Sequence, residues 1–340
     1  MKGLRGRKIE EFIYKERMEE VAIISGTAHP ELGKKIASIL GKECIFPEIY
    51  HYPTGDFELS LPTRVRRKTV FIIQTFPAKN VPYFTLELLF LINAAYKASA
   101  EEVTVIVPHL GWDQSDKKWR GRMPIVGELI AAFIYQCGAK RYVGVQFHSP
   151  QFPGFFPLPV IVDHLVADQI LLDYVLKEKL NKGAVLLPGD LGFSKIARKL
   201  ADKLGIPLVE VEKERTSGHK VKIHKIYGNV KGKRLIIWDD KIVEGTTIRA
   251  IAEHVEKRGA KEITVIATHG LFGGKAIENL NHPLIKRIIV TDSIPHEKIL
   301  NKLPIVEVSI APLLAEAIRE IATGGSISRL FQGSVLQTEQ

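Results

Sequence analysis

The sequence predicts an α/β protein of two tandem domains with mainly parallel sheets. Short apolar runs alternate with amphipathic helical patterns along the chain, which is typical of strands and helices that form parallel sheets. Blocks of the first half recur in the second half in the same order, which indicates duplication of one domain. The chain has 340 residues, of which 45% are hydrophobic and 25% charged, as expected for about two globular domains.

The first half contains four apolar runs that predict buried strands and three patterns that predict helices. The strands cover residues 21–25, 70–75, 103–107 and 142–147, and the helices cover residues 31–40, 84–97 and 125–136. Phe57, Leu59 and Leu61 alternate with polar residues and predict one more strand. The preceding turn, at residues 52–56, is either a hairpin tip or a ligand contact.

The second half follows the same alternation. Its predicted strands cover residues 184–187, 235–238, 263–267 and 288–291, and its helices cover residues 166–179, 193–204, 248–258 and 312–321. We expect domains at residues 20–163 and 164–330, with the last helix able to pack back on the first domain.

Two blocks carry the evidence for duplication. Residues 21–26 match residues 184–189, and residues 100–106 match residues 260–266 at a nearly equal offset. The alternative is a chance similarity between two ordinary βαβ units. At the place that matches residues 239–247, the first half has no acidic pair and no Gly/Thr turn.

The segment after the strand at residues 235–238 carries the clearest functional signal. Asp239 and Asp240 are expected at the carboxyl end of this strand, where open α/β sheets bind ligands. Gly245, Thr246 and Thr247 then enter a helix whose free N–H groups suit an anion. The carboxylates suit sugar hydroxyls or hydrated magnesium, so the segment predicts a phosphorylated-sugar site. The alternative is an ordinary loop with a solvated acidic tip.

The net charge of +10 indicates an anionic partner, either phosphorylated metabolites or nucleic acid. Much of the excess positive charge lies at residues 213–234, which contain eight Lys and Arg residues and one acid, Glu214. Tyr227 is the single aromatic residue of this segment, which does not favour a stacking surface for nucleic acid. We therefore expect a basic loop, either solvated or acting on phosphates.

The remaining composition favours a cytoplasmic protein with no membrane partner. Cys44 and Cys137 have no metal-binding spacing and fit a reducing compartment. No apolar run is long enough to cross a bilayer, and residues 1–20 have no apolar signal core.

Two polar residues are expected at strand ends and could share a metal ion. His148 follows the strand at residues 142–147, and Asp190 follows the strand at residues 184–187. Together they could hold a hydrated magnesium ion, although a lone histidine such as His148 is more often an ordinary loop residue. With a sugar-phosphate site and abundant cations, these features favour phosphoryl or diphosphoryl transfer, in which Lys213 and Arg215 would neutralise developing charge.

Several motifs resemble those of the ribose-phosphate pyrophosphokinase family, from about residue 21 to residue 330. The matching segments are Ser25-Gly26-Thr27-Ala28-His29-Pro30, Asp116 with Lys118 and Arg120, Phe147-His148 with Gly154-Phe155-Phe156, Lys213-Glu214-Arg215, Ala267-Thr268-His269-Gly270-Leu271-Phe272 and Val290-Thr291-Asp292-Ser293-Ile294-Pro295.

The resemblance implies two tandem phosphoribosyltransferase-type, Rossmann-like domains and a reaction. ATP would give its β,γ-diphosphate to the 1-hydroxyl of ribose 5-phosphate, leaving AMP, with Mg²⁺ as cofactor. Members of the family self-associate to dimers or hexamers.

The resemblance also implies a role for each candidate residue. Lys213 and Arg215 would be catalytic, and His148 and Asp190 would bind the metal. Ribose phosphate would contact Asp239, Asp240, Val243, Glu244, Gly245, Thr246 and Thr247. ATP would contact Tyr52, Thr54, Gly55, Asp56, Gln114, Ser115, Asp116 and Lys118, with the turn at residues 52–56 usually serving a neighbouring subunit.

The chain departs from the family at the phosphate loop. The family motif Asp-Thr-Gly-Gly-Thr is replaced by residues 243–247, so that Val243 stands for Asp. Gln114 replaces an expected Arg, Gln146 an Asp near the metal, and Thr54 an Asp in the adenine turn. A divergent diphosphokinase is the first interpretation. The alternatives are a catalytically weak regulatory subunit, an enzyme for another sugar phosphate, a nucleobase phosphoribosyltransferase and a nucleic-acid binder.

Overall fold

The computed structural model describes residues 15–189, 193–215 and 221–331. These residues form two compact units: residues 15–165 with 311–331 form unit 1, and the described part of residues 166–310 forms unit 2. The last helix, α9 (Ala311–Thr323), belongs to unit 1, where it packs on α2 (Pro30–Ile39). Among the described residues, no helix is long and apolar enough to span a bilayer.

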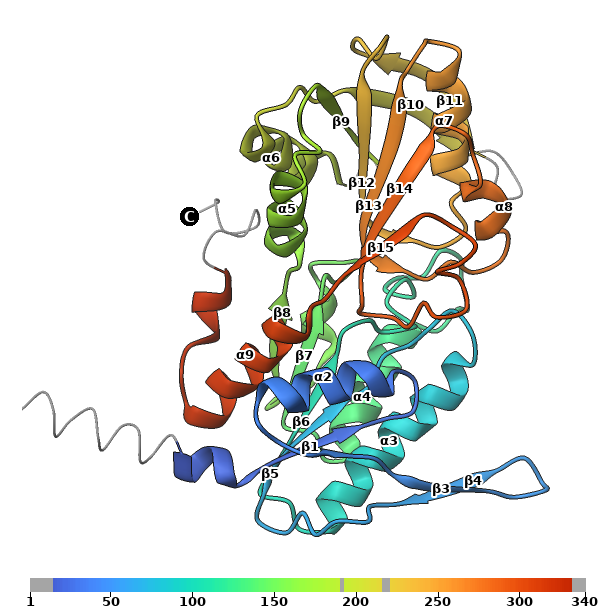
Figure 1. Ribbon diagram of the computed structural model, residues 1–340. Helices are drawn as coiled ribbons and strands as arrows, with labels where there is room; N and C mark the ends of the chain where they lie inside the picture. The colour runs from blue at the N-terminus through green and yellow to red at the C-terminus, as the bar shows by residue number, and fades with distance from the viewer. Residues whose placement is uncertain (1–14, 190–192, 216–220, 332–340) are drawn as a thin grey trace, which may run out of the picture. The chain divides into compact units, whose positions relative to one another are not determined.

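Unit 1 is built on a six-stranded parallel sheet with the order β2-β1-β5-β6-β7-β8 (Figure 1). The strands are β1 (Val21–Ser25), β2 (Cys44–Ile45), β5 (Thr69–Ile73), β6 (Glu102–Val107), β7 (Arg141–Val145) and β8 (Ile161–Leu165). Helices α3 (Val81–Lys97) and α4 (Val126–Gln136) share one apolar core with this sheet. The short helices η1 (Phe152–Phe155) and η3 (Ile327–Phe331) complete the unit.

Unit 2 is built on a five-stranded parallel sheet with the order β15-β14-β13-β12-β9. The strands are β9 (Ala184–Pro188), β12 (Arg234–Ile242), β13 (Glu262–Gly270), β14 (Ile285–Thr291) and β15 (Ile305–Val308). Helices α5 (Asp168–Lys177) and α6 (Ser194–Leu204) cover one face. The other face packs against α7 (Thr246–Glu256), α8 (Ala276–Leu280) and the hairpin of β10 (Glu210–Arg215) and β11 (Val221–Tyr227).

The two units share one order of elements, which supports the predicted duplication. The order β1-β5-β6-β7-β8 in unit 1 corresponds to β9-β12-β13-β14-β15 in unit 2. In each unit an antiparallel hairpin lies between the first helix and the second central strand; in unit 1 it is formed by β3 (Glu48–His51) and β4 (Phe57–Ser60). Asn80 and Gly245, which precede α3 and α7, both adopt a left-handed backbone conformation. The predicted α/β class with mainly parallel sheets is therefore confirmed.

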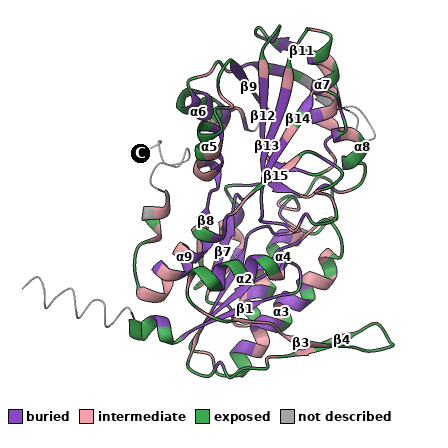
Figure 2. Ribbon diagram, in the orientation of Figure 1, coloured by how far each residue is buried: buried purple, intermediate pink, exposed green. Residues whose placement is uncertain are grey.

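Burial explains why most central strands were predictable. In the parallel sheets the strands are covered on both faces, so they form continuous apolar runs, and Figure 2 colours them mostly as buried. Two details of the prediction were wrong. Asp239 and Asp240 lie within β12 rather than after it, because β12 continues to pair with β13 up to Ile242. Lys213 and Arg215 lie on a paired strand, β10, rather than on a loop.

Candidate functional site

The acidic pair of unit 2 is shaped by its own backbone. The Asp240 N–H donates to Asp239 Oδ1 at 2.9 Å, and the Lys241 N–H donates to Asp240 Oδ1 at 2.8 Å. Both aspartates are partly exposed on β12, whereas Lys241 is buried. Each carboxylate thus accepts a backbone N–H, and a carboxylate can accept several hydrogen bonds at its two oxygens.

The backbone turns into α7 directly after this pair. Gly245 is the residue before the helix, with φ +71°, and a side chain there would meet Leu280 at 2.8 Å, so glycine is required on both counts. Within the described part of the chain no side-chain cap is found at the amino end of α7, where the first N–H groups belong to Thr246 and Thr247. This end of the helix suits an anion through its N–H groups and its dipole.

Three hydrogen bonds fix the loop between β12 and α7. The Ile242 carbonyl accepts hydrogen bonds from the N–H groups of Leu271 at 2.9 Å and Phe272 at 3.2 Å. The Asn279 side chain donates to the Glu244 carbonyl at 2.8 Å. The Glu244 carboxylate lies against Gly274, where an added Cβ would be 2.2 Å from Oε1. Val243, the first residue of this loop, is 39% exposed.

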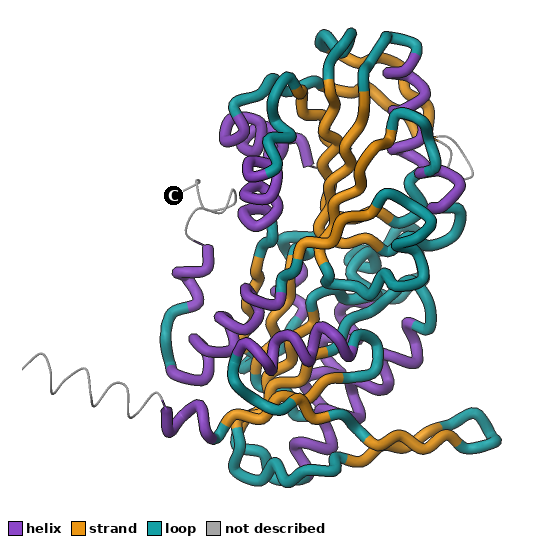
Figure 3. The backbone as a smooth tube through the Cα atoms, viewed as in Figure 1, coloured by secondary structure: helices purple, strands orange, loops and turns teal. Residues whose placement is uncertain are grey.

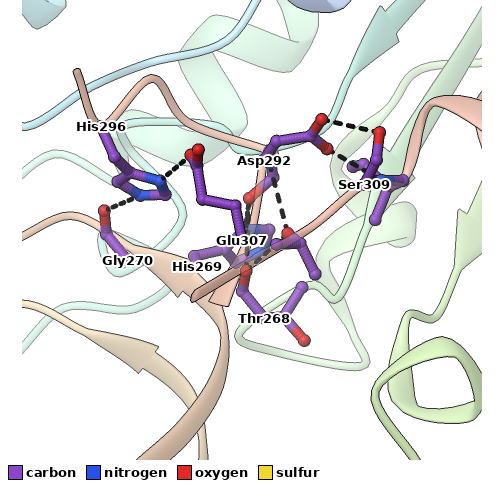
Figure 4. A network of polar contacts seen from close by, with 10 residues as sticks. Thr268, His269, Gly270, Asp292, His296, Glu307 and Ser309 are labelled. Carbon is purple, nitrogen blue, oxygen red and sulfur yellow. Dashed lines mark hydrogen bonds and ion pairs between the residues drawn. The ribbon is translucent and has the colours of Figure 1, made fainter. Parts of the chain in front are cut away.

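A polar network stiffens the adjacent ends of β13, β14 and β15 (Figure 4). His296 is buried, with Nδ1 2.6 Å from Glu307 Oε1 and Nε2 2.8 Å from the Gly270 carbonyl. His269 Nδ1 lies 2.9 Å from Ser293 Oγ. Further bonds join Thr291 to the Thr268 carbonyl at 2.7 Å and Asp292 to Ser309 at 2.7 Å and to the Ile310 N–H at 2.8 Å. Sequence reasoning missed this network, because its members lie far apart in the chain.

The proposed catalytic cations lie on the hairpin that packs beside α7. Lys213 pairs in register with Ile223, and Arg215 pairs with Val221. Arg258, just after α7, donates to the Ile226 carbonyl at 2.7 Å and to the Gly228 carbonyl at 2.9 Å. The end of β11 is thereby tied to the helix that begins at the acidic loop.

The first group of predicted ATP residues forms the turn between β3 and β4. Tyr52 donates its N–H to the Asp56 carbonyl at 2.9 Å, and Gly55 donates to the Tyr52 carbonyl at 3.0 Å. The side chains of Thr54 and Asp56 are hydrogen-bonded to each other. All four residues are exposed, as is the hairpin tip in Figure 2.

The second group lies in the loop after β6, which holds Gln114, Ser115, Asp116 and Lys118. Ser115 is partly structural, because its Oγ accepts the Val126 N–H at 3.1 Å at the start of α4. Gln114 and Lys118 are exposed, and Asp116 is half-buried.

Of the predicted metal pair, His148 is exposed two residues beyond the buried Gln146, and Asp190 lies outside the described residues. The Gln146 side-chain oxygen is buried and has no hydrogen-bond partner within the described parts of the chain. A hard oxygen of this kind can bind magnesium, so the local donor set is compatible with the ion. The described residues contain no cluster of three His, Cys, Asp or Glu side chains arranged for a metal.

His164 holds the backbone that leads to His148. Its Nε2 accepts the Phe147 N–H at 3.0 Å, and its ring stacks on Phe147 at 4.4 Å. Burial lowers the pKa of His164 to about 4, so the ring is the neutral acceptor that this contact requires.

These features define an α/β protein of two parallel-sheet units. In unit 2, an acidic pair near the end of β12 and the start of α7 together suit a phosphorylated ligand. Comparison with known proteins gives the family. The model of the N-terminal domain of ribose phosphate pyrophosphokinase matches residues 21–138, and that of the phosphoribosyl synthetase-associated domain matches residues 197–332.

Whole relatives agree with these matches. The chain is 36% identical to ribose-phosphate pyrophosphokinase of Aquifex aeolicus over 92% of its own length and 100% of that protein. It is 33% identical to the Bacillus subtilis protein, over 92% and 98% of the two chains. The crystal structure of phosphoribosylpyrophosphate synthetase from Mycobacterium smegmatis superposes with a TM-score of 0.82 at 32% identity, covering 90% and 99%. The chain belongs to the ribose-phosphate pyrophosphokinase family, and it is an enzyme of the transferase class.

Proposed function

We propose that the chain transfers the β,γ-diphosphate of Mg-ATP to the 1-hydroxyl of ribose 5-phosphate. The 1-oxygen forms a bond to the β-phosphorus, the bond from that phosphorus to the α-phosphate oxygen breaks, and the hydroxyl proton is released. The products are phosphoribosyl diphosphate and AMP. The observation that carries the proposal is the acidic pair on β12 followed by the uncapped start of α7.

Each part of this segment suits one part of ribose 5-phosphate. Asp239 and Asp240 have lone pairs for the ribose hydroxyls, and the N–H groups of residues 245–247 suit the 5-phosphate. Val243 and Glu244 complete the loop, and Glu244 directs its carboxylate to Gly274. Lys213 and Arg215 would neutralise charge that develops on the transferred diphosphate.

In this proposal ATP contacts the β3–β4 turn and the loop after β6. The exposed residues of the turn suit a nucleotide bound by the same or a neighbouring subunit. Bound Mg²⁺ would neutralise phosphate charge, with His148, the Gln146 oxygen and Asp190 as its candidate ligands. Family membership also supports self-association to a dimer or hexamer and a cytoplasmic location.

The test is AMP release from Mg-ATP by the purified chain, with and without ribose 5-phosphate. The proposed reaction requires AMP to form in proportion to phosphoribosyl diphosphate, and only when the sugar phosphate is present. AMP release that is independent of the sugar, or transfer to another sugar phosphate only, would contradict it.

One observation favours a second candidate, a catalytically weak paralogue that regulates an active relative. Val243 replaces the acid of the family motif with a side chain that cannot accept a hydrogen bond. A regulatory chain would bind ribose 5-phosphate and ATP without releasing AMP, and would change the rate of an active relative when the two are mixed.

A further inference from the structure

The β3–β4 hairpin is an arm that projects from the body of unit 1 (Figure 3). Its strands pair over four residues each, from Glu48 with Ser60 to His51 with Phe57. A two-stranded hairpin of this length does not hold its own direction in water. Within unit 1, packing against α3 therefore helps to set where the tip points.

Tyr83, in the first turn of α3, provides that packing. Its ring stacks on His51 at 5.8 Å and 25°, and lies 4.7 Å from the ring of Phe57. Phe57 also contacts Phe90, two turns further along the face of α3, at 5.1 Å. Since His51 and Phe57 form the last pair before the tip, the contact acts at the base of the turn.

The same part of α3 is fixed to the centre of unit 1 by Glu87, which is fully buried. The Glu87 carboxylate accepts the Thr27 N–H at 2.7 Å, the Thr27 hydroxyl at 2.8 Å and the Gln74 side-chain N–H at 3.0 Å. These bonds join α3 to the loops after β1 and β5. The position of Tyr83 is therefore fixed, since three hydrogen bonds to Glu87 hold the helix one turn away.

A third loop is held by the same helix. The Trp112 indole N–H donates to Thr85 Oγ1 at 2.9 Å, and the Thr85 hydroxyl donates to the Val81 carbonyl at 2.7 Å. Trp112 begins the segment that continues to Gln114 and Lys118. The first two turns of α3 thus contact residues that flank both segments to which the ATP role is assigned.

We propose that Tyr83 is a positioning residue for ATP: it fixes the direction of the β3–β4 hairpin, and so the placement of the turn that meets the nucleotide. This inference rests on the proposed function. If the hairpin samples several directions, the apparent affinity for ATP falls by the fraction that remains in the binding direction. Turnover at saturating ATP and affinity for ribose 5-phosphate should not change, because Tyr83 is not among the residues assigned to catalysis or to the sugar phosphate.

The experiment compares Tyr83→Leu with Tyr83→Phe, which keeps the ring, and with Tyr96→Leu at the far end of α3. Calorimetry measures Mg-ATP binding to the full-length chain, steady-state assays measure kcat and both KM values, and amide hydrogen exchange follows the hairpin. Tyr83→Leu should raise the Kd and KM for Mg-ATP by about three- to tenfold and speed exchange in the hairpin. Tyr83→Phe should stay closer to the wild type than Tyr83→Leu does, and Tyr96→Leu should match the wild type.

His51→Ala gives the same test without altering α3, since His51 is exposed and cannot unfold the core. It should raise the Kd for Mg-ATP in the same direction, and by less in the Tyr83→Leu background than alone. Unchanged Mg-ATP affinity in both single variants, with normal binding by the wild type, would overturn the inference and leave the proposed function standing. A wild-type chain that binds no Mg-ATP would overturn both.

Discussion

The carboxylate of Asp239 lies against the α-carbon of Gly189, so closely that a Cβ at residue 189 would be 2.2 Å from Asp239 Oδ2. Gly189 directly follows β9, and its N–H donates to the Trp238 carbonyl at 2.8 Å. The neighbouring strand thus places one of the two carboxylates assigned to the ribose hydroxyls.

Gly189→Ala should therefore displace Asp239 and weaken binding of ribose 5-phosphate. Loss of one or two hydrogen bonds to hydroxyls predicts a rise in Kd of about three- to tenfold, measured by calorimetry. Gly154→Ala is the control, since its added Cβ would have no described atom within 4 Å apart from its chain neighbours. Equal affinities in the wild type and Gly189→Ala would remove Asp239 from the sugar site.

The sequence was sufficient to predict the central strands and the loop that carries the site. The run at residues 21–25 coincides with β1, because a strand covered on both faces contains only apolar residues. The acidic pair and residues 245–247 were assigned to one site. They lie close together because a short loop joins β12 to α7. The assignment could not show how far β12 extends, because pairing with β13 decides this.

Other features could not be read from the sequence. Strand β8 carries Asp163 and His164, and β10 alternates acids and bases, so neither forms an apolar run. His296 meets Glu307 and Gly270 only because β13, β14 and β15 are neighbours in the sheet. No local spacing signals such a contact. Likewise, the stacking of Tyr83 on His51 joins a helix to a hairpin across residues that no periodicity relates.

Lys213→Ala should lower kcat far more than it weakens ribose 5-phosphate binding, because its proposed partner is charge in the transition state. Loss of one such group predicts a fall in kcat of about a hundredfold, with the Kd for ribose 5-phosphate nearly unchanged. Lys233→Ala, an exposed change in the same basic segment, should leave kcat near the wild-type value. An equal loss of binding and turnover would reassign Lys213 to ground-state binding.

The lowered pKa of His164 predicts that the protein loses stability in acid. Burial lowers its pKa from 6.5 to about 4, so between these values the unfolded chain binds a proton that the folded chain does not. Neutral His164 therefore makes its full contribution to the free energy of unfolding above pH 6.5. This contribution falls as the pH drops toward 4, by at most about 3 kcal/mol.

Urea unfolding of the wild type and His164→Asn at several pH values would measure this contribution. The asparagine does not titrate, so the difference between the two free energies should shrink as the pH falls from 6.5 to 4. Gly154→Ala, which adds no titratable group, should show no such trend. A constant difference for His164→Asn across this range would contradict the assignment of a neutral, buried ring.

A substitution at Val243 distinguishes the two candidate functions. The Val243 side chain is 39% exposed in a loop whose backbone is held through Ile242 and Glu244, so Val243→Asp should keep the fold. The N–H groups at the start of α7 remain, and phosphate binds chiefly to these. The aspartate adds an acceptor for the ribose or the turn, and one such hydrogen bond contributes about 0.5–1.5 kcal/mol.

We therefore expect a slow or weak-binding diphosphokinase whose kcat/KM for ribose 5-phosphate rises about three- to tenfold in Val243→Asp. Val243→Leu is the control for a change of size alone and should give no increase. Paired steady-state assays of AMP release measure all three proteins at the same Mg-ATP concentration. If the wild type releases no AMP and Val243→Asp restores none, the divergent-enzyme proposal fails and the regulatory-subunit proposal replaces it.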